Sequence, residues 1–230
     1  MMVTVTQISG TQGLRCREGR ARIPELPITQ LITGAIWDDV TSIVAKRIAR
    51  FSGIRYDFTL SEENFRLDFA VALSKRLDYP HKVFAEYPCD KAPSQKLDLF
   101  VDEPPGVCLE FKFFRPIPSG LNPPMTQHLG SLWADVVKLA TLCKPDRIKF
   151  LVVFADARFV RYFQGQGVIP SKEGSRIDLS LSPRSAPKTL ITTLEKRLPH
   201  SSIPKEIHAI LEATRVSRGG PFSGFLLSLV

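Results

Sequence analysis

Two short apolar runs separated by a strong turn signal constrain the fold of this chain more than any other feature. "KLDLFVD" (96–102) and "GVCLEFKFF" (106–114) are rich in Leu, Val and Phe, and the junction "DEPPG" contains two prolines and a glycine. Proline and glycine at this density favour a tight turn, and apolar runs on both sides of a turn favour paired antiparallel strands. The stretch therefore predicts a β-hairpin.

Charged side chains lie inside both runs, where a buried strand normally carries apolar residues. Successive side chains of a strand point to opposite faces, so alternate residues share an environment. On one face, Asp98 of the first run is expected nearly opposite Glu110 of the second, with Lys112 two residues further along. The other face is expected to hold the apolar residues Leu97, Leu99, Val101, Val107, Leu109, Phe111 and Phe113.

Two interpretations of the charged face remain open. In the first, the hairpin is half-buried, and opposite charges attract across its solvent-facing side. In the second, the face is partly covered, because Phe100, Cys108 and Phe114 share it. Asp98 and Glu110 would then repel each other unless a cation lies between them. Mg²⁺ suits such a place, since it takes one or two carboxylates, backbone carbonyls, water and phosphate oxygens as ligands.

Lys112 adds a further chemical group to this face. Its ammonium is two residues from Glu110 on the same side, so it can position or deprotonate an attacking water and offset charge on a phosphate. Two carboxylates, a metal ion and a lysine are suited to phosphodiester hydrolysis.

The segments around the hairpin predict a layered fold. Apolar residues at three- and four-residue spacing indicate a helix over 29–52, and Ser61 is a good N-cap for a second helix that stops at Pro80. Further on, the patterns predict a strand at 82–87, a helix at 125–143 and a strand at 147–156 buried on both faces. The order α-β-β-β-α-β over 58–160 predicts an α/β fold with a mixed central sheet flanked by helices.

The two ends of the chain are harder to assign. Residues 1–28 are polar and show no sustained period, which predicts a loosely ordered N-terminal arm, and residues 29–230 are expected to form a single domain. In this domain, 161–230 is a C-terminal extension of the core at 58–160. Patterns near and within it predict a short helix at 157–164, a strand at 176–182, helices at 186–198 and 204–215, and a strand at 222–230 that pairs within the chain or across an interface.

Asp98, eleven intervening residues and then Glu110 and Lys112 of "LEFK" resemble the D-x(n)-E-x-K signature of the PD-(D/E)xK nuclease superfamily, which has the restriction-endonuclease-like fold. The predicted order of elements agrees with the core of that superfamily, although Leu97 stands where the motif's name has proline. The resemblance implies a Mg²⁺-dependent endonuclease, with Mn²⁺ as a substitute, that hydrolyses DNA. Asp98 and Glu110 would bind the metal, and Lys112 would orient the water.

The same resemblance implies roles for helical residues. The first helix of the superfamily often turns a glutamate toward the metal, and Glu62 matches this better than Glu63 because it lies on the apolar stripe; alternatively, Glu62 is an ordinary first-turn acid. Gln127 in "TQHLGSLWADVVKLA" matches a polar site residue or is simply exposed. Asp135 and Lys138 of that helix resemble an acid and a base that often follow, or they form a surface pair.

Other residues have weaker assignments. Glu86 in "FAEYP" borders the metal site or faces solvent, and His128 contacts substrate or is structural. Lys91, Lys96 and Arg115, with the loop at 115–124, are candidates for phosphate contacts.

Composition limits the classes of function and partner. The formal net charge is +8, which favours a polyanionic partner, and no P-loop, dinucleotide-binding or HExxH motif is present. The four cysteines lack metal-ligand spacing, and no apolar run is long enough for a membrane span, so we expect a cytoplasmic protein that binds DNA. A restriction or defence nuclease is favoured, with a repair or recombination nuclease or a non-catalytic nucleic-acid-binding subunit as alternatives, and homodimerisation is left open.

Overall fold

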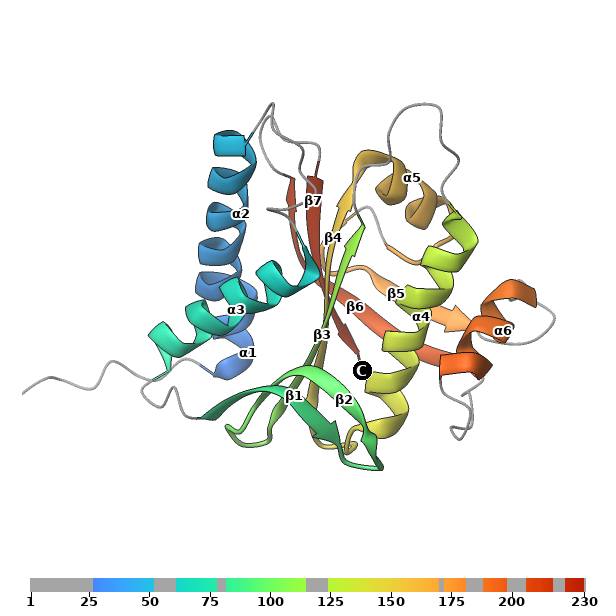
Figure 1. The fold of residues 1–230 in the computed structure, drawn as a ribbon, viewed down its shortest axis with the longest axis horizontal. Helices are drawn as coiled ribbons and strands as arrows, with labels where there is room; N and C mark the ends of the chain where they lie inside the picture. Colours follow the sequence, from blue (N-terminus) through green and yellow to red (C-terminus); the bar gives the residue numbers. More distant parts are fainter. Residues whose placement is uncertain are drawn as a thin grey trace, which may run out of the picture.

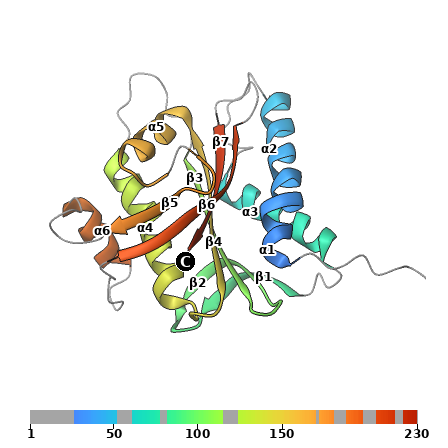
Figure 2. The same ribbon diagram turned by 180° about the vertical axis from the view of Figure 1, so that it is seen from behind.

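The computed structural model describes residues 27–51, 61–77, 82–114, 124–169, 172–180, 188–197, 206–216 and 222–229. These residues form a mixed seven-stranded sheet with helices against both faces (Figures 1 and 2). The predicted α/β class, with a mixed central sheet flanked by helices, is confirmed. The predicted N-terminal arm lies outside the described residues, apart from its last two positions.

The sheet places the hairpin next to a buried parallel strand. Its strands are β1 (Val83–Cys89), β2 (Ala92–Val101), β3 (Val107–Phe114), β4 (Ile148–Asp156), β5 (Arg176–Ser180), β6 (Glu206–Val216) and β7 (Phe222–Leu229). They lie in the order β1-β2-β3-β4-β7-β6-β5, in which only β3 and β4 pair in parallel. A parallel pair needs a long crossover, which the helix between β3 and β4 provides. The strands after residue 161 belong to the same sheet.

The helices that precede the β2–β3 hairpin and those that follow it cover different faces of the sheet. They are α1 (Ile28–Leu31), the π-helical turn η1 (Ile32–Ile36), α2 (Trp37–Phe51), α3 (Glu62–Arg76), α4 (Met125–Leu142), α5 (Ala157–Gly165) and α6 (Lys188–Arg197). Figure 1 shows α1, α2 and α3 on one side and α4, α5 and α6 on the other. The predicted cap of α3 is present, since the Ser61 side chain accepts a hydrogen bond from the Asn64 backbone. No helix in the described ranges has both the length and the apolar character needed to cross a membrane.

The apolar core forms one layer on each face of the sheet. Leu99 and Leu109 pack with α2 and α3, whereas Phe100 and Cys108 pack with α4 and α5. Strand β4 contributes to both layers, so the prediction that it is buried on both faces is confirmed.

One apolar residue of the hairpin lies on the face opposite to the predicted one. Leu97 was expected to share a face with Leu99, but it packs in the layer formed by α4. The β1–β2 register pairs Leu99 with Ala85 and Leu97 with Tyr87, and Glu86 between these partners has a φ of 52°. This left-handed residue lies across from Asp98, at the point where the side-chain alternation of β2 fails.

The predicted helix at 204–215 is wrong, because this segment forms β6. Glu, Ala and Leu in the segment are good helix formers, but Ile207, Ala209, Leu211 and Ala213 also alternate as in a strand. Strand β6 pairs with β5 on one side and β7 on the other. Backbone pairing on both sides outweighs the local helix propensity. The predicted strand at 222–230 is confirmed as β7, and it pairs within the chain between β4 and β6.

Candidate active site

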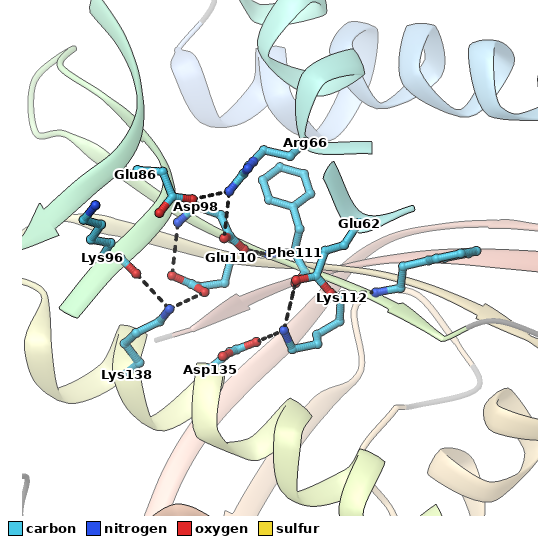
Figure 3. Close-up of polar contacts among 11 residues, drawn as sticks. Glu62, Arg66, Glu86, Lys96, Asp98, Glu110, Phe111, Lys112, Asp135 and Lys138 are labelled. Carbon is cyan, nitrogen blue, oxygen red and sulfur yellow. Dashed lines mark hydrogen bonds and ion pairs between the residues drawn. The ribbon is translucent and has the colours of Figure 1, made fainter. Parts of the chain in front are cut away.

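At the end of the hairpin away from its turn, hydrogen bonds to carboxylate side chains replace the backbone hydrogen bonds between β2 and β3. Backbone pairing covers three residue pairs, the last being Leu99 with Leu109. At the next position, Asp98 N donates to Glu110 Oε1 at 3.3 Å, and Phe111 N donates to Asp98 Oδ2 at 2.8 Å (Figure 3). The predicted approach of Asp98 and Glu110 is therefore present, and each carboxylate is oriented by the opposite strand.

Glu110 is the most deeply buried acid of this group, with 1% of its surface exposed. Its Oε2 lies 2.6 Å from Lys138 Nζ, which comes from α4 and also donates to Lys96 O at 2.9 Å. Burial raises the pKa of Glu110 well above its ordinary value, the Asp135 carboxylate raises it further, and Lys138 opposes both effects. An ionised Glu110 is therefore costly and depends on a nearby cation.

Lys112 lies between carboxylates from helices on the two faces of the sheet. Its Nζ is 2.7 Å from Asp135 Oδ2 of α4 and 3.3 Å from Glu62 Oε1 of α3, and it donates to Phe111 O at 3.3 Å. Burial alone would lower the pKa of Lys112, but the Asp135 and Glu62 carboxylates outweigh it and raise the pKa above its ordinary value. Lys112 is therefore a cation at neutral pH.

Glu62, and not Glu63, is the glutamate of α3 that reaches the site. Its Oε2 accepts a hydrogen bond from Phe113 N at 3.3 Å, in addition to the contact with Lys112, whereas Glu63 is exposed. Burial raises the pKa of Glu62, and Lys112 opposes this increase. The contacts with β3 also show that Glu62 is more than a first-turn acid.

Asp98 has a cationic neighbour that the sequence analysis missed. Arg66 Nη1 lies 3.5 Å from Asp98 Oδ1, and the same nitrogen forms an ion pair with Glu86. Burial raises the pKa of Asp98, while the hydrogen bond from Phe111 N lowers it. A sequence signal existed, since Arg66 follows Glu62 by four residues and such residues share one face of a helix.

Asp135 and Lys138 do not form the surface pair that was one of their two interpretations. Asp135 binds Lys112 and Lys138 binds Glu110, so both helical residues point to β3. We use the term carboxylate–lysine cluster for Glu62, Asp98, Glu110, Lys112, Asp135 and Lys138.

Two candidates from the start of α4 lie apart from this cluster. Gln127 is exposed in the first turn and has no side-chain hydrogen bond within the described part of the chain. It precedes Asp135 by eight residues, which is about 12 Å of helical rise. His128 packs edge-on against Phe114 and Phe159, with centroid distances of 5.7 and 5.1 Å. Arg115, a candidate for phosphate contact, lies outside the described residues.

The cluster contains more negative than positive charge. Four carboxylates and two lysines give a formal charge of −2 when all are ionised, while Arg66 and Glu86 balance each other. The available donors are oxygens, as Mg²⁺ requires: Asp98 and Glu110 each accept a hydrogen bond from the opposite strand, and the carbonyl of Phe111 follows Glu110 in the chain. Among the described residues, no three His, Cys, Asp or Glu side chains are already grouped around one metal position. A hard cation would therefore complete its shell with water.

Known proteins provide no independent assignment of this site. Comparisons of the chain with protein-family models, curated proteins and solved structures each give no match. The resemblance to the PD-(D/E)xK superfamily stays a prediction, and function has to be argued from the side chains of the cluster.

Proposed function

We propose that this protein is a metal-dependent endonuclease of the PD-(D/E)xK type that hydrolyses phosphodiester bonds in DNA, with a restriction or defence role as the favoured setting. One observation carries the proposal: Asp98 and Glu110 meet where β2 and β3 cease backbone pairing, and Lys112 is kept cationic beside them. A structural salt-bridge network has no need for two more carboxylates than lysines in a largely buried place.

Asp98 and Glu110, with the carbonyl of Phe111, would hold Mg²⁺ or Mn²⁺. Such an ion, when bound, polarises a phosphate oxygen and lowers the pKa of a coordinated water. The backbone amides of Asp98 and Phe111 orient the two carboxylates beforehand, so little side-chain freedom is lost on binding.

Lys112 would act as a hydrogen-bond donor to the attacking water and the phosphate. Its raised pKa argues against water deprotonation, which was one of the two roles open from sequence, and favours orientation of the water and stabilisation of charge on the phosphate. Asp135 positions Lys112 through the 2.7 Å contact. Glu62, whose pKa burial raises, is the more exposed neighbour of Lys112 and is the group placed to accept a proton.

DNA is the proposed substrate because the chain carries a formal net charge of +8 in spite of the acidic cluster. Cations elsewhere on the surface would attract the phosphate backbone, while the cluster itself would take the metal ion. The DNA backbone and the metal ion would therefore bind to different groups of side chains.

The test uses supercoiled plasmid with Mg²⁺, with Mn²⁺, or with a chelator. We expect the parent to nick or linearise the plasmid only with a metal, and Asp98→Ala and Lys112→Ala to abolish cutting while keeping the circular dichroism spectrum. Lys149→Ala is the matched control, because Lys149 lies on the adjacent strand β4 and contacts only Pro145 O in the described structure. Equal cutting by all four proteins would refute the assignment.

The products distinguish the forms of the proposal. Discrete fragments favour a restriction enzyme, and preference for branched or flapped DNA favours a repair or recombination nuclease. Metal-independent binding without cutting would instead indicate a non-catalytic nucleic-acid-binding subunit.

A further inference from the structure

Arg66 is a cation with unused donors at the edge of the carboxylate–lysine cluster. Both of its ion pairs, with Glu86 and Asp98, are made through Nη1. Its Nε and Nη2 have no hydrogen-bond partner among the described residues, and 25% of the side chain is exposed. A guanidinium presents its donors as a planar fork that matches a phosphate group. Arg66 therefore combines a fixed position with free donors.

The link from Arg66 to Asp98 is the longest ion pair of the site. It measures 3.5 Å, compared with 2.6 Å for Lys138 with Glu110 and 2.7 Å for Lys112 with Asp135. The contact of Arg66 with Glu86 is much shorter. Figure 3 shows both contacts of Arg66, with Glu86 and with Asp98. A ligand that displaces Arg66 from Asp98 would leave the ion pair with Glu86 in place.

Glu86 occupies a strained position next to this link. Its φ of 52° is unusual for a residue with a side chain, and the β1–β2 register places it across from Asp98. Strained backbone conformations of this kind cluster at functional sites. In this position Glu86 forms an ion pair with Arg66, and this second carboxylate holds the guanidinium at 3.5 Å from Asp98.

We propose that Arg66 binds a non-bridging phosphate oxygen of the nucleic-acid strand at the cluster, and that Glu86 is its positioning residue. This rests on the proposed nuclease function and names the group that holds the substrate. In the ligand-free protein the guanidinium partly neutralises Asp98, and it would be free to bind the phosphate when Asp98 holds a metal ion.

Two binding measurements on Arg66→Gln test this without relying on cleavage. Removal of a cation from Asp98 makes the cluster more negative, so we expect tighter Mn²⁺ binding by calorimetry. Loss of a charged phosphate contact should weaken binding of a short labelled duplex, measured by anisotropy with Ca²⁺, about tenfold or more. It should also reduce the salt slope by about one. Glu86→Gln should instead weaken Mn²⁺ binding, because Asp98 is then the only carboxylate that pairs with Arg66 and the guanidinium competes more strongly with the metal ion.

Arg76→Gln is the matched control, since Arg76 is an exposed arginine of the same helix that pairs with Asp39. It should change neither affinity. If the parent cuts and binds DNA but Arg66→Gln binds both ligands like the parent, the role of Arg66 is refuted and the nuclease proposal stands. If the parent neither binds nor cuts DNA, both are refuted.

A second inference concerns the outward side of α3 and does not depend on the nuclease activity. Glu63, Leu67, Val71 and Lys75 follow one another at four-residue spacing and are all exposed, with 59% of Leu67 and 39% of Val71 accessible. Neither Glu63 nor Lys75 has an ion-pair partner among the described residues. The row thus ends in an unpaired acid at one end and an unpaired base at the other.

This row is complementary to itself in the antiparallel direction. With a two-fold axis at position 69, Glu63 of one copy meets Lys75 of the other, and Leu67 meets Val71. Rows of residues at four-residue spacing are the ridges that interlock in the commonest class of helix packing. Symmetric interfaces in which one patch meets itself are also the usual form of dimer.

We infer that α3 is the contact through which two copies of this chain associate. Four apolar side chains and two symmetric ion pairs are few for an interface, so the dimer should be weak. Glu62 and Arg66 point to the sheet and remain available to the cluster.

Charge reversal gives a direct test by sedimentation equilibrium. We expect the parent to self-associate and Glu63→Lys and Lys75→Glu each to be monomeric, because like charges then meet at both ends. An equal mixture of the two variants should form heterodimers, and the double variant should dimerise again. A monomeric parent, or self-association that neither substitution changes, would overturn the inference.

Discussion

Two groups of largely buried charge lie in this protein, and they differ in their balance of acidic and basic side chains. Arg147 forms an ion pair with Asp90 at 2.9 Å, and its guanidinium lies 4.3 Å from the centre of the Phe100 ring. Asp90 also accepts a hydrogen bond from Lys144 N at 3.0 Å. One cation thus meets one anion, and each has one further contact, although Arg147 Nη1 has no hydrogen-bond partner among the described residues.

The carboxylate–lysine cluster has no such balance. It holds four acids and two lysines, and burial raises the pKa of Glu62, Asp98 and Glu110. A raised carboxylate pKa means that the ionised form is unfavourable in the folded protein. The Arg147–Asp90 pair is arranged for stability, whereas the cluster keeps an unfavourable excess of charge that a bound cation would relieve. The two groups should therefore respond oppositely to neutralisation.

The largest expected difference is in activity. Asp98→Asn keeps the shape and a hydrogen-bond acceptor but removes the charge, so we expect plasmid cleavage to fall about 1,000-fold or more. The same change should raise Tm slightly, by no more than about 4 °C, because it removes an unfavourable buried charge. Calorimetry of the metal-free protein measures the second effect, and a clear drop in Tm would place Asp98 with the structural ion pairs.

Neutralisation of the balanced pair should have the reverse effect. Arg147→Met leaves the Asp90 carboxylate without its cation, so we expect a loss of about 2–3 kcal/mol in the free energy of unfolding and a Tm lower by about 5–10 °C. Plasmid cleavage by Arg147→Met should persist at temperatures below its unfolding transition. Arg158→Met, which changes an exposed arginine of α5, is the control and should leave Tm unchanged. Loss of cleavage with a normal Tm in Arg147→Met would remove the distinction between the two groups.

The rise in Tm on addition of metal should distinguish the two groups by a smaller but more specific effect. A ligand that binds only the folded state stabilises it by about 1.4 kcal/mol at ten times its Kd. We expect Mn²⁺ to raise the Tm of the parent and of Arg147→Met by equal amounts, and to leave that of Asp98→Asn unchanged. Differential scanning calorimetry without DNA is sufficient, and an equal rise in all three proteins would mean that the ion binds elsewhere.

The sequence predicted the centre of the cluster better than its surroundings, for a physical reason. Asp98, Glu110 and Lys112 belong to one hairpin, where a turn and alternation of side chains set their relative positions. Arg66 and Asp135 come from helices, and their part in the site depends on how those helices are placed against the sheet. Helical spacing indicates which residues share a face, but it does not indicate which face meets which strand.

The errors in the fold have the same origin. Leu97 lies on the face opposite to the expected one at the point where the neighbouring strand has the left-handed residue Glu86, and nothing in β2 itself signals this. The segment at 206–216 became a strand because β5 and β7 lie on both sides of it. Interactions with segments distant in the chain decided both cases. Gln127, chosen by resemblance alone, lies outside the cluster for the related reason that it is two helical turns from Asp135.

The smallest expected effect concerns His128, a titratable group that belongs to neither kind of charge cluster. It packs against Phe114 and Phe159, and partial burial lowers its pKa. The folded state then binds fewer protons than the unfolded state just below pH 6.5, so the stability contributed by neutral His128 is present above that pH and lost as the pH falls. His128→Phe keeps the ring contacts, and its Tm should fall less than that of the parent between pH 7.5 and 5. Because His128 is partly exposed, we expect a difference of less than about 2 °C. A larger fall in the variant would mean that His128 gains a counter-charge on folding, as the lysines of the cluster do.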